Sequence, residues 1–284
     1  MRRQSAESEY WNGQAGEHWS SFHQRYDELL GGYGRGAIER ANPKPGERFV
    51  DIGCGAGATT LDVGRRVGTE GSVLGVDLSG PMLRTARQRA RRERATNVRF
   101  VRADAANHRF ERESLDGIVS RFGVMFFEDP VQAFAHVGRA LRPGGRLAIA
   151  CWQQGLANEW VTVPGGAMAQ HLPMPEFGDP GGPGLFSLAD ATLIRSMLRD
   201  AGFGAIQIES LVLPHRFGVV VDDAVSFMMQ TQVAARMLAG ASPQQADAAV
   251  QAVRDALEPH VQEDGVYLDG AAWLVTARWS ANRE

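Results

Sequence analysis

The sequence predicts an α/β protein built on a mainly parallel sheet, and three observations support this fold class. Short apolar runs alternate with helical patterns between about residues 46 and 152, an alternation typical of parallel sheets with right-handed crossovers. A glycine-rich turn separates the first apolar run from the first helical pattern. Acidic residues end the second and third runs, which indicates polar groups along the carboxyl edge of the sheet.

The first half of the chain is expected to hold a helical segment and then five strands. Residues 1–45 are helix-like and rich in aromatic side chains, and the NPKPG segment at 42–46 breaks the chain. The strands are expected at residues 48–52, 73–77, 98–104, 117–120 and 146–152. Helices are expected at 60–67, 81–94 and 131–141, with Ser79 as a cap for the second, and RPGG at 142–145 is expected to form a turn.

The second half is expected to add two insertions to this core. The pattern loosens at 153–187, where breakers cluster; a helix at 188–201 and a strand at 205–213 follow, and 222–261 is again helical. A strand at 272–278 closes the pattern. We therefore predict one domain whose parts are an N-terminal helical lid (1–45), an α/β core (46–152), a loop-rich insertion (153–187), a core helix and strand (188–213), a helical cap (214–270) and a closing strand (271–284).

Composition excludes several classes of protein. With 284 residues, 44% apolar and 22% charged, the chain is not disordered, fibrous or coiled-coil. The formal charge of −3 gives no basic field for nucleic acid, and Lys44, the only lysine, lies outside any P-loop. Two cysteines are too few for a disulfide framework or a cysteine-based zinc site, and no metal is expected. No leader or membrane span is visible, so we expect a cytoplasmic protein, monomer or homodimer, with no membrane partner.

The strongest motif is DIGCGAG at residues 51–57, where a strand runs into three glycines at two-residue spacing. Glycine allows sharp turns and close approach of a ligand to the backbone. Asp77 lies 20 residues after the last glycine, at the place where an acidic residue binds ribose hydroxyls in nucleotide-binding sheets. Asp104 ends the third run in the same way. The run from Gly53 to Ala58 also fits a dinucleotide fingerprint, but Asp51 would repel a pyrophosphate and is better placed for an ammonium group.

Four segments in this order resemble the successive motifs of class I S-adenosylmethionine-dependent methyltransferases. They are DIGCGAG at 51–57, VDLSGPML at 76–83, Asp104-Ala105 and LRPGG at 141–145. YWNGQAGEHW at 10–19 and SRFGVMFF at 120–127 resemble the bacterial ubiquinone/menaquinone-type branch of small-molecule enzymes. The resemblance implies a Rossmann-like sheet of seven strands in the order 3-2-1-4-5-7-6, with strand 7 antiparallel and helices on both sides.

The resemblance also implies roles for individual residues. Gly53, Gly55 and Gly57, with Cys54 between them, would lie against the methionine part of S-adenosylmethionine, and Asp51 would help to hold its amino group. Asp77 would bind the ribose and Leu78 the adenine. Asp104 would accept from the adenine amino group and Ala105 would donate its N–H. The remaining expected cofactor contacts are Ser120 and Arg121 beside the methyl donor and, from the lid, Trp19 and Tyr26.

No pattern in the sequence marks a catalytic group. None of the seven histidines pair at metal-ligand spacing. His171 and His215 lie in the segments expected over the substrate, so each is a candidate general base as well as an ordinary packing or surface residue. The function favoured is methylation of a small hydrophobic or aromatic metabolite on O, N or C, yielding S-adenosylhomocysteine. The alternatives are an NAD-dependent oxidoreductase and a nucleoside-binding protein without enzymatic activity.

Overall fold

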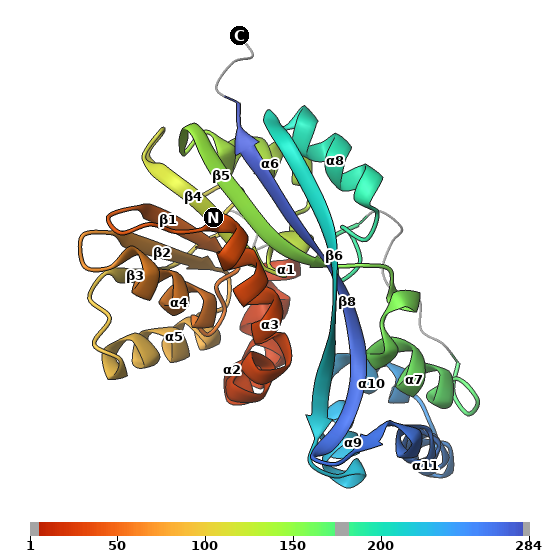
Figure 1. The fold of residues 1–284 in the computed structure, drawn as a ribbon. Helices are drawn as coiled ribbons and strands as arrows, with labels where there is room; N and C mark the ends of the chain where they lie inside the picture. Colours follow the sequence, from red (N-terminus) through yellow and green to blue (C-terminus); the bar gives the residue numbers. More distant parts are fainter. Residues whose placement is uncertain (1–5, 174–181, 281–284) are drawn as a thin grey trace. The chain divides into compact units, whose positions relative to one another are not determined.

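The computed structural model describes residues 6–173 and 182–280 and divides the chain into two compact units (Figure 1). Met1–Trp152, Gly181–Leu211 and Ala272–Glu284 form the first unit, and Gln153–Pro180 and Val212–Ala271 form the second. The predicted insertions 153–187 and 214–270 therefore supply most of the second unit. Among the described residues, no helix is both long and apolar enough to cross a membrane.

The sheet has the predicted order. Its strands run in the order β3-β2-β1-β4-β5-β8-β6, with β1 to β5 parallel and β8 antiparallel to β5. The strand β8 thus takes the place expected for strand 7, and the two-residue strand β7 pairs with β8 beside this path. The strands are β1 (Arg48–Ile52), β2 (Ser72–Asp77), β3 (Val98–Arg102), β4 (Leu115–Arg121), β5 (Leu141–Trp152), β6 (Phe203–Gly218), β7 (Val261–Gln262) and β8 (Gly265–Trp279).

Helices lie between the strands and before the first one. Those of the first unit are α1 (Ala6–Asn12), α2 (Gln14–Ser21), α3 (His23–Ala41), α4 (Ala58–Val67), α5 (Gly80–Arg92), α6 (Pro130–Gly138) and α8 (Ala191–Asp200). Those of the second unit are α7 (Glu159–Met168), α9 (Val221–Met229), α10 (Gln232–Leu238) and α11 (Pro243–Leu257). Short 3-10 turns lie at Val124–Phe126, Gly155–Ala157 and Glu258–His260.

One face of the sheet is covered by α3, α4 and α5. A single buried cluster joins Ile38 of α3 and Leu61 of α4 to Phe49, Val73 and Val98 of the first three strands. These strand residues are aligned across the sheet, because Phe49 pairs with Val73 and Val73 with Val98. Burial of this apolar surface holds the helices against the sheet, and it fixes the helix that follows the glycine-rich turn.

Helix α5 begins as its sequence predicts. The Ser79 hydroxyl accepts a hydrogen bond from the N–H of Met82, and Pro81 occupies the first turn. Buried Met82, Leu83 and Ala86 lie on the inner face, while Arg84, Arg91 and Arg92 are exposed. The cap matters for the site because it fixes the short connection between the end of β2 and the helix.

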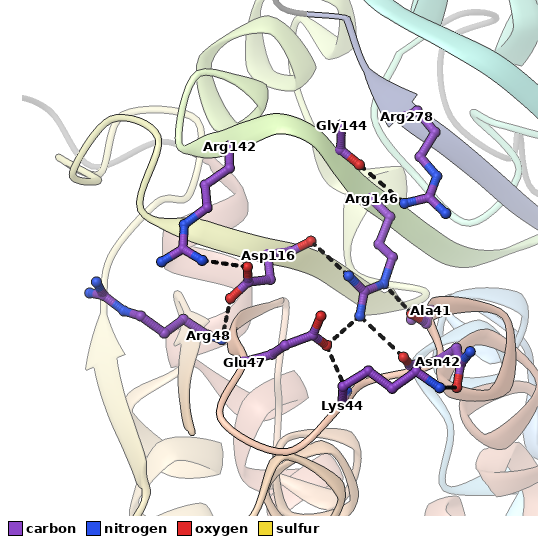
Figure 2. A network of polar contacts seen from close by, with 10 residues as sticks. All are labelled: Ala41, Asn42, Lys44, Glu47, Arg48, Asp116, Arg142, Gly144, Arg146 and Arg278. Atoms are coloured by element: carbon purple, nitrogen blue, oxygen red, sulfur yellow. Dashed lines mark hydrogen bonds and ion pairs between the residues drawn. The ribbon is translucent and has the colours of Figure 1, made fainter. Parts of the chain in front are cut away.

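A polar network ties α3 to the opposite, amino-terminal edge of the sheet (Figure 2). The Arg146 guanidinium of β5 donates to the carbonyl oxygens of Ala41 and Asn42, which end α3, and pairs with Glu47. Positive charge at a helix C-terminus is favourable because the last carbonyls have no intrahelical partners. Arg146 thereby anchors the far end of the helix whose beginning reaches the candidate site.

Two predictions for the middle of the chain were wrong. The RPGG segment was expected to form a turn before a strand, but β5 includes it. Leu115 of β4 pairs with Leu141, and Gly117 of β4 pairs with Arg146. Residues 142–145 therefore form an irregular excursion within the strand. The loop-rich insertion 153–187 contains the helix α7, despite Pro164 in its interior. Packing of α7 on α11 within the second unit offsets the hydrogen bond that proline removes.

Smaller differences concern the ends of elements. The third strand ends at Arg102, two residues before Asp104, and the helix expected at 131–141 ends at Gly138 because β5 begins at Leu141. The strands β6 and β8 are longer than expected, and both extend into segments assigned to the helical insertion. The N-terminal segment is three helices rather than one, with breaks at Gly13 and Phe22.

Candidate functional site

The ends of three neighbouring parallel strands bring the predicted site residues together. β1 ends at Ile52 and continues into the glycine loop, and β2 ends at Asp77, whose register partner on β3 is Arg102. Asp104 follows β3 by two residues. Because parallel strands end at the same edge of a sheet, the glycine loop and these two acids form one row, and ligands of open α/β sheets bind at this edge.

The three glycines of the loop all have left-handed backbones, with φ of +66° at Gly53, +52° at Gly55 and +84° at Gly57. They serve different purposes. A Cβ on Gly53 would lie 2.5 Å from the Cα of Gly123, and one on Gly57 would lie 3.0 Å from the Cβ of Ala86. A Cβ on Gly55 would meet only Met82, with Sδ at 3.5 Å. Packing therefore demands Gly53 and Gly57, whereas a side chain at Gly55 would meet ordinary contact with Met82 and is limited chiefly by the left-handed backbone.

Asp77 joins the glycine loop to the start of α5. Its carboxylate accepts from the N–H of Gly55 at 2.7 Å and from the N–H of Ser79 at 2.7 Å. Burial raises the pKa of this carboxyl, and the backbone hydrogen bonds act in the opposite direction. The backbone N–H of Leu78 acts on the same carboxylate, so three backbone donors hold it beside the glycine loop.

Asp51, at the end of β1, carries an unsatisfied oxygen. Its Oδ2 accepts from the Thr60 hydroxyl at 2.6 Å, while its buried Oδ1 has no hydrogen-bond partner among the described residues. Burial raises the pKa of Asp51 to about 7, although the Thr60 hydrogen bond and the charge of Arg121 both lower it. A buried acceptor without a partner is costly, and a cationic donor placed beside it would remove that cost.

The residues expected around the adenine lie close to this row. Asp104 is half-buried; its Oδ1 accepts from the N–H of Ala106 at 2.9 Å and its Oδ2 from the side chain of Asn107 at 2.6 Å. Ala105 is buried and Leu78 is half-buried. Asp104 thus fixes a tight turn directly after β3, which presents the Ala105 backbone beside it.

Ser120 and Arg121 end β4, next to the glycine loop. The Ser120 hydroxyl donates to the carbonyl oxygen of Ile52 at 2.7 Å and accepts from the N–H of Gly123 at 3.2 Å. Arg121 forms an ion pair with Asp27 of α3 at 3.2 Å. Ser120 therefore holds the loops after β1 and β4 together, and Arg121 reaches from the sheet to α3.

A cavity of about 180 Å³ lies between α3, α4, α5 and the end of β4. Four arginines and two aspartates are among its lining residues, a formal excess of two positive charges: Arg35, Arg65, Arg89, Arg121, Asp27 and Asp62. Asp27 also pairs with Arg89 at 2.7 Å, and Arg89 donates to the carbonyl oxygen of Ala56 in the glycine loop at 3.1 Å. The excess of guanidinium groups suits a small anion.

The aromatic residues of the N-terminal helices contact one another. The rings of Trp19 and Tyr26 are stacked, with centroids 3.7 Å apart and planes within 5°, and Trp11 meets Trp19 edge-on. Burial raises the pKa of Tyr26, whose hydroxyl lies 3.0 Å from Nε2 of His18. Since α1 and α2 pack against α5, the predicted lid is docked on the first unit in this structure.

The two candidate histidines and Cys54 occupy different environments. His171 is exposed, whereas His215 of β6 is buried, and burial lowers the pKa of His215 to about 4. His215 is therefore uncharged at neutral pH and a weak base. Cys54 is buried within the glycine loop, and burial raises the pKa of its thiol, so it packs the loop rather than reacting. No cluster of metal ligands occurs in residues 6–173 and 182–280.

Sequence reasoning missed several residues that shape this site. Thr60, which binds Asp51, follows the glycine loop by three residues, so its position after the motif was a usable signal. Asn12, Asp27 and Arg89 act on residues 66, 62 and 33 positions away. No local pattern marks such partners, because only the folded chain brings them together.

Comparisons with known proteins agree with this arrangement. Residues 49–145 match a model of the methyltransferase domain. The chain is 32% identical over 146 residues to aklanonic acid methyltransferase DauC of a Streptomyces species, covering 49% of this chain and 66% of that protein. It is 38% identical over 128 residues to the ubiquinone/menaquinone biosynthesis C-methyltransferase UbiE of Azotobacter vinelandii, covering 43% of this chain and 51% of that protein.

A solved structure extends the likeness to almost the whole chain at the level of the fold. It is phosphoethanolamine N-methyltransferase 2 of Haemonchus contortus in complex with phosphomonomethylethanolamine and S-adenosylhomocysteine. The TM-score is 0.60 at 20% identity, covering 99% of this chain and 61% of that one. The chain thus spans about two thirds or less of the length of each of these three proteins.

Proposed function

We propose that this chain, whose residues 49–145 belong to the class I S-adenosylmethionine-dependent methyltransferases, transfers a methyl group from that cofactor to a small hydrophobic or aromatic metabolite. The observation that carries the proposal is the hydrogen bond of Asp77 to the Gly55 N–H at 2.7 Å. It joins a glycine loop with left-handed backbones to a buried carboxylate at the carboxyl edge of the sheet. That edge is where a nucleoside is bound in such folds.

The residues present fit the cofactor at both of its ends. Asp77 would accept hydrogen bonds from the ribose hydroxyls, while Leu78 and Asp104 would contact the adenine. The unpartnered Oδ1 of Asp51 would receive the ammonium of the amino-acid end, directly or through water. The arginine-lined cavity would receive its carboxylate, since Arg89 of its lining also donates to the carbonyl oxygen of Ala56 in the glycine loop.

Bound there, the cofactor supplies a methyl group already activated by a sulfonium. The work left for the protein is therefore alignment, exclusion of water and, for acidic acceptors, removal of a proton. Gly55 leaves room for close approach, Ser120 holds the two loops at a fixed separation, and Trp19 and Tyr26 would cover the amino-acid end. These tasks need few reactive side chains, which agrees with a site rich in binding groups.

The acceptor class is inferred from the names of the relatives. The relatives are named for aklanonic acid and for ubiquinone/menaquinone biosynthesis, which supports a small, largely apolar acceptor. Of the two candidate bases, His171 is exposed and available to a ligand, whereas His215 is buried and only weakly basic. His171 therefore stays the candidate general base of the two, for acceptors that lose a proton.

Methyl transfer from labelled S-adenosylmethionine to a panel of phenols, quinols, carboxylic acids and amines tests this function. We expect labelled product from at least one apolar member, and a lower kcat for His171→Ala with acceptors that ionise. Thermal unfolding with S-adenosylhomocysteine and, separately, with NAD distinguishes the oxidoreductase. Stabilisation by NAD alone would overturn the proposal, and stabilisation by S-adenosylhomocysteine without transfer to any acceptor would favour a nucleoside-binding protein.

A further inference from the structure

The side chain of Asn12, at the end of α1, holds the connection between β2 and α5. Its Nδ2 donates to the carbonyl oxygen of Leu78 at 3.0 Å, and its Oδ1 accepts from the N–H of Gly80 at 3.0 Å. The second hydrogen on Nδ2 is used by the carbonyl oxygen of Ser8 at 2.6 Å. Asn12 therefore hydrogen-bonds the backbone on both sides of Ser79 through one planar amide.

The orientation of this amide is set by its partners. Two carbonyl oxygens face Nδ2 and one N–H faces Oδ1, so the reverse orientation would place Oδ1 against two acceptor oxygens and Nδ2 against a donor N–H. An asparagine amide has two donor hydrogens and one acceptor oxygen, and here every one of these groups is used. A side chain of the same shape without the amide nitrogen could not make these contacts.

The residues that Asn12 binds are in turn connected to the carboxylate expected to bind the ribose. Leu78 directly follows Asp77, and the Ser79 N–H donates to Asp77 Oδ1 at 2.7 Å. The close packing of α2 supports the same connection: a Cβ on buried Gly16 would lie 2.7 Å from the Ser79 hydroxyl. The path from Asn12 to Asp77 thus runs through one short, hydrogen-bonded segment.

A second contact on the Leu78 carbonyl shows how much the segment depends on side chains from elsewhere. Arg102, at the end of β3, donates its Nε to the same oxygen at 3.2 Å. Arg102 is exposed, whereas Asn12 is half-buried, so the asparagine contact is the better protected from competing water. The Gly80 N–H has Asn12 as its side-chain partner.

We propose that Asn12 is a positioning residue for the nucleoside half of the cofactor: it fixes residues 78–80, and through them the carboxylate of Asp77 and the side chain of Leu78. The inference rests on the proposed function, because it assumes a nucleoside cofactor at this edge. The N-terminal helices are then part of the cofactor site itself, rather than a cover that closes over a finished site.

The affinities for two ligands distinguish this positioning role from a general destabilisation of the fold. S-adenosylhomocysteine contains the nucleoside and the amino-acid end, whereas 5′-methylthioadenosine contains only the nucleoside. The affinity of the unchanged protein for S-adenosylhomocysteine is measured first by calorimetry. Absence of that binding refutes the proposed function, whereas the inference about Asn12 is judged only from variants of a protein that binds.

The main variant is Asn12→Asp, which keeps the shape and the acceptor for Gly80 but turns a carboxylate oxygen toward the carbonyls of Leu78 and Ser8. We expect both ligands to bind about tenfold more weakly, and by the same factor, since a lost hydrogen bond and a buried repulsion together cost that much. Asn12→Leu, which removes all three contacts, is expected to act in the same direction and serves if the first variant does not fold.

Ser20→Ala is the matched control. It removes two hydrogen bonds of α2 to α5, to the Thr85 hydroxyl at 2.8 Å and to the Pro81 carbonyl oxygen at 3.4 Å, and it keeps the hydrogen bonds that Asn12 makes to residues 78–80. We expect unchanged affinity for both ligands. Unchanged affinity in both folded Asn12 variants would overturn the inference. So would equal weakening by Ser20→Ala, which would show that docking alone matters, or a loss confined to S-adenosylhomocysteine, which would assign Asn12 to the amino-acid end.

Discussion

Replacing Gly55 by alanine separates the needs of the fold from the needs of the ligand. The added Cβ would lie 3.5 Å from Met82 Sδ and 3.8 Å from its Cε, which is ordinary van der Waals contact. The cost to folding is therefore the left-handed backbone, with φ of +52°, worth about 1–2 kcal/mol for an L-residue. For a chain of this size, such a loss lowers Tm by roughly 2–8 °C.

The cost to the cofactor should be larger than the strain alone. The Gly55 N–H donates to the Asp77 carboxylate, so the new methyl group would lie beside the proposed cofactor, and overpacking there costs about 1–3 kcal/mol. Affinity for S-adenosylhomocysteine is then expected to fall by at least about fivefold, up to about 150-fold. Calorimetric titration gives the affinity, and thermal unfolding gives the stability of the same sample.

Gly46→Ala provides the control for backbone strain. Gly46 also has a left-handed backbone, with φ of +85°, and a Cβ there would meet nothing within 4 Å. It lies before β1, at the edge of the sheet away from the site. We expect a similar loss of Tm and no loss of affinity. If Gly55→Ala bound S-adenosylhomocysteine as tightly as Gly46→Ala does, the assignment of the glycine loop to the cofactor would be refuted.

Three further predictions follow from the site. Asp77→Asn should weaken binding of S-adenosylhomocysteine by at least about tenfold, because charge-assisted hydrogen bonds are worth about 1.5–3 kcal/mol each; equal affinity in calorimetry would remove Asp77 from the site. Arg121→Met should weaken binding of S-adenosylhomocysteine but leave that of 5′-methylthioadenosine unchanged, and a loss for both ligands would contradict the cavity's assignment to the carboxylate. Burial raises the pKa of Asp51 from 3.8 to about 7. Between these pH values the Asp51 carboxyl is therefore protonated in the native state and ionised in the unfolded chain. Stability should therefore fall as the pH rises from about 4 to 7, and urea unfolding of Asp51→Asn should show a smaller fall; the same slope in both proteins would argue against a protonated Asp51.

The parts of the fold that could be predicted are those with a local signal. The strand at Arg48–Ile52 was predicted to the residue, since an apolar run ends at a glycine. The strand order followed from the resemblance, and β8 lies where it was expected. The helix α7 had no such signal, because Pro164 and two following glycines outweigh its propensity and packing on α11 decides the outcome.

In the site, too, the parts with a local sequence signal could be predicted and the others could not. The glycine loop, Asp77 and Asp104 could be located because each lies at the end of a strand or within two residues of it. The hydrogen bonds that give these groups their properties could not, because they join distant positions. Asp51 binds Thr60, Asp77 binds Gly55, and Asn12 binds residues 78–80. Whether a carboxylate is saturated, buried or left with a free oxygen depends on these contacts, so its chemistry is known only from the folded chain.

The central claim is that the carboxyl edge of β1, β2 and β3 binds S-adenosylmethionine through the glycine loop and the loops after the next two strands. Hydrogen exchange with and without S-adenosylhomocysteine tests it most directly, because each amide reports on its own position. We expect slower amide exchange at residues 53–57, 78–80 and 105–106 when S-adenosylhomocysteine is bound, and no slowing with NAD. Protection elsewhere with these three segments unchanged, or protection of them by NAD, would contradict it.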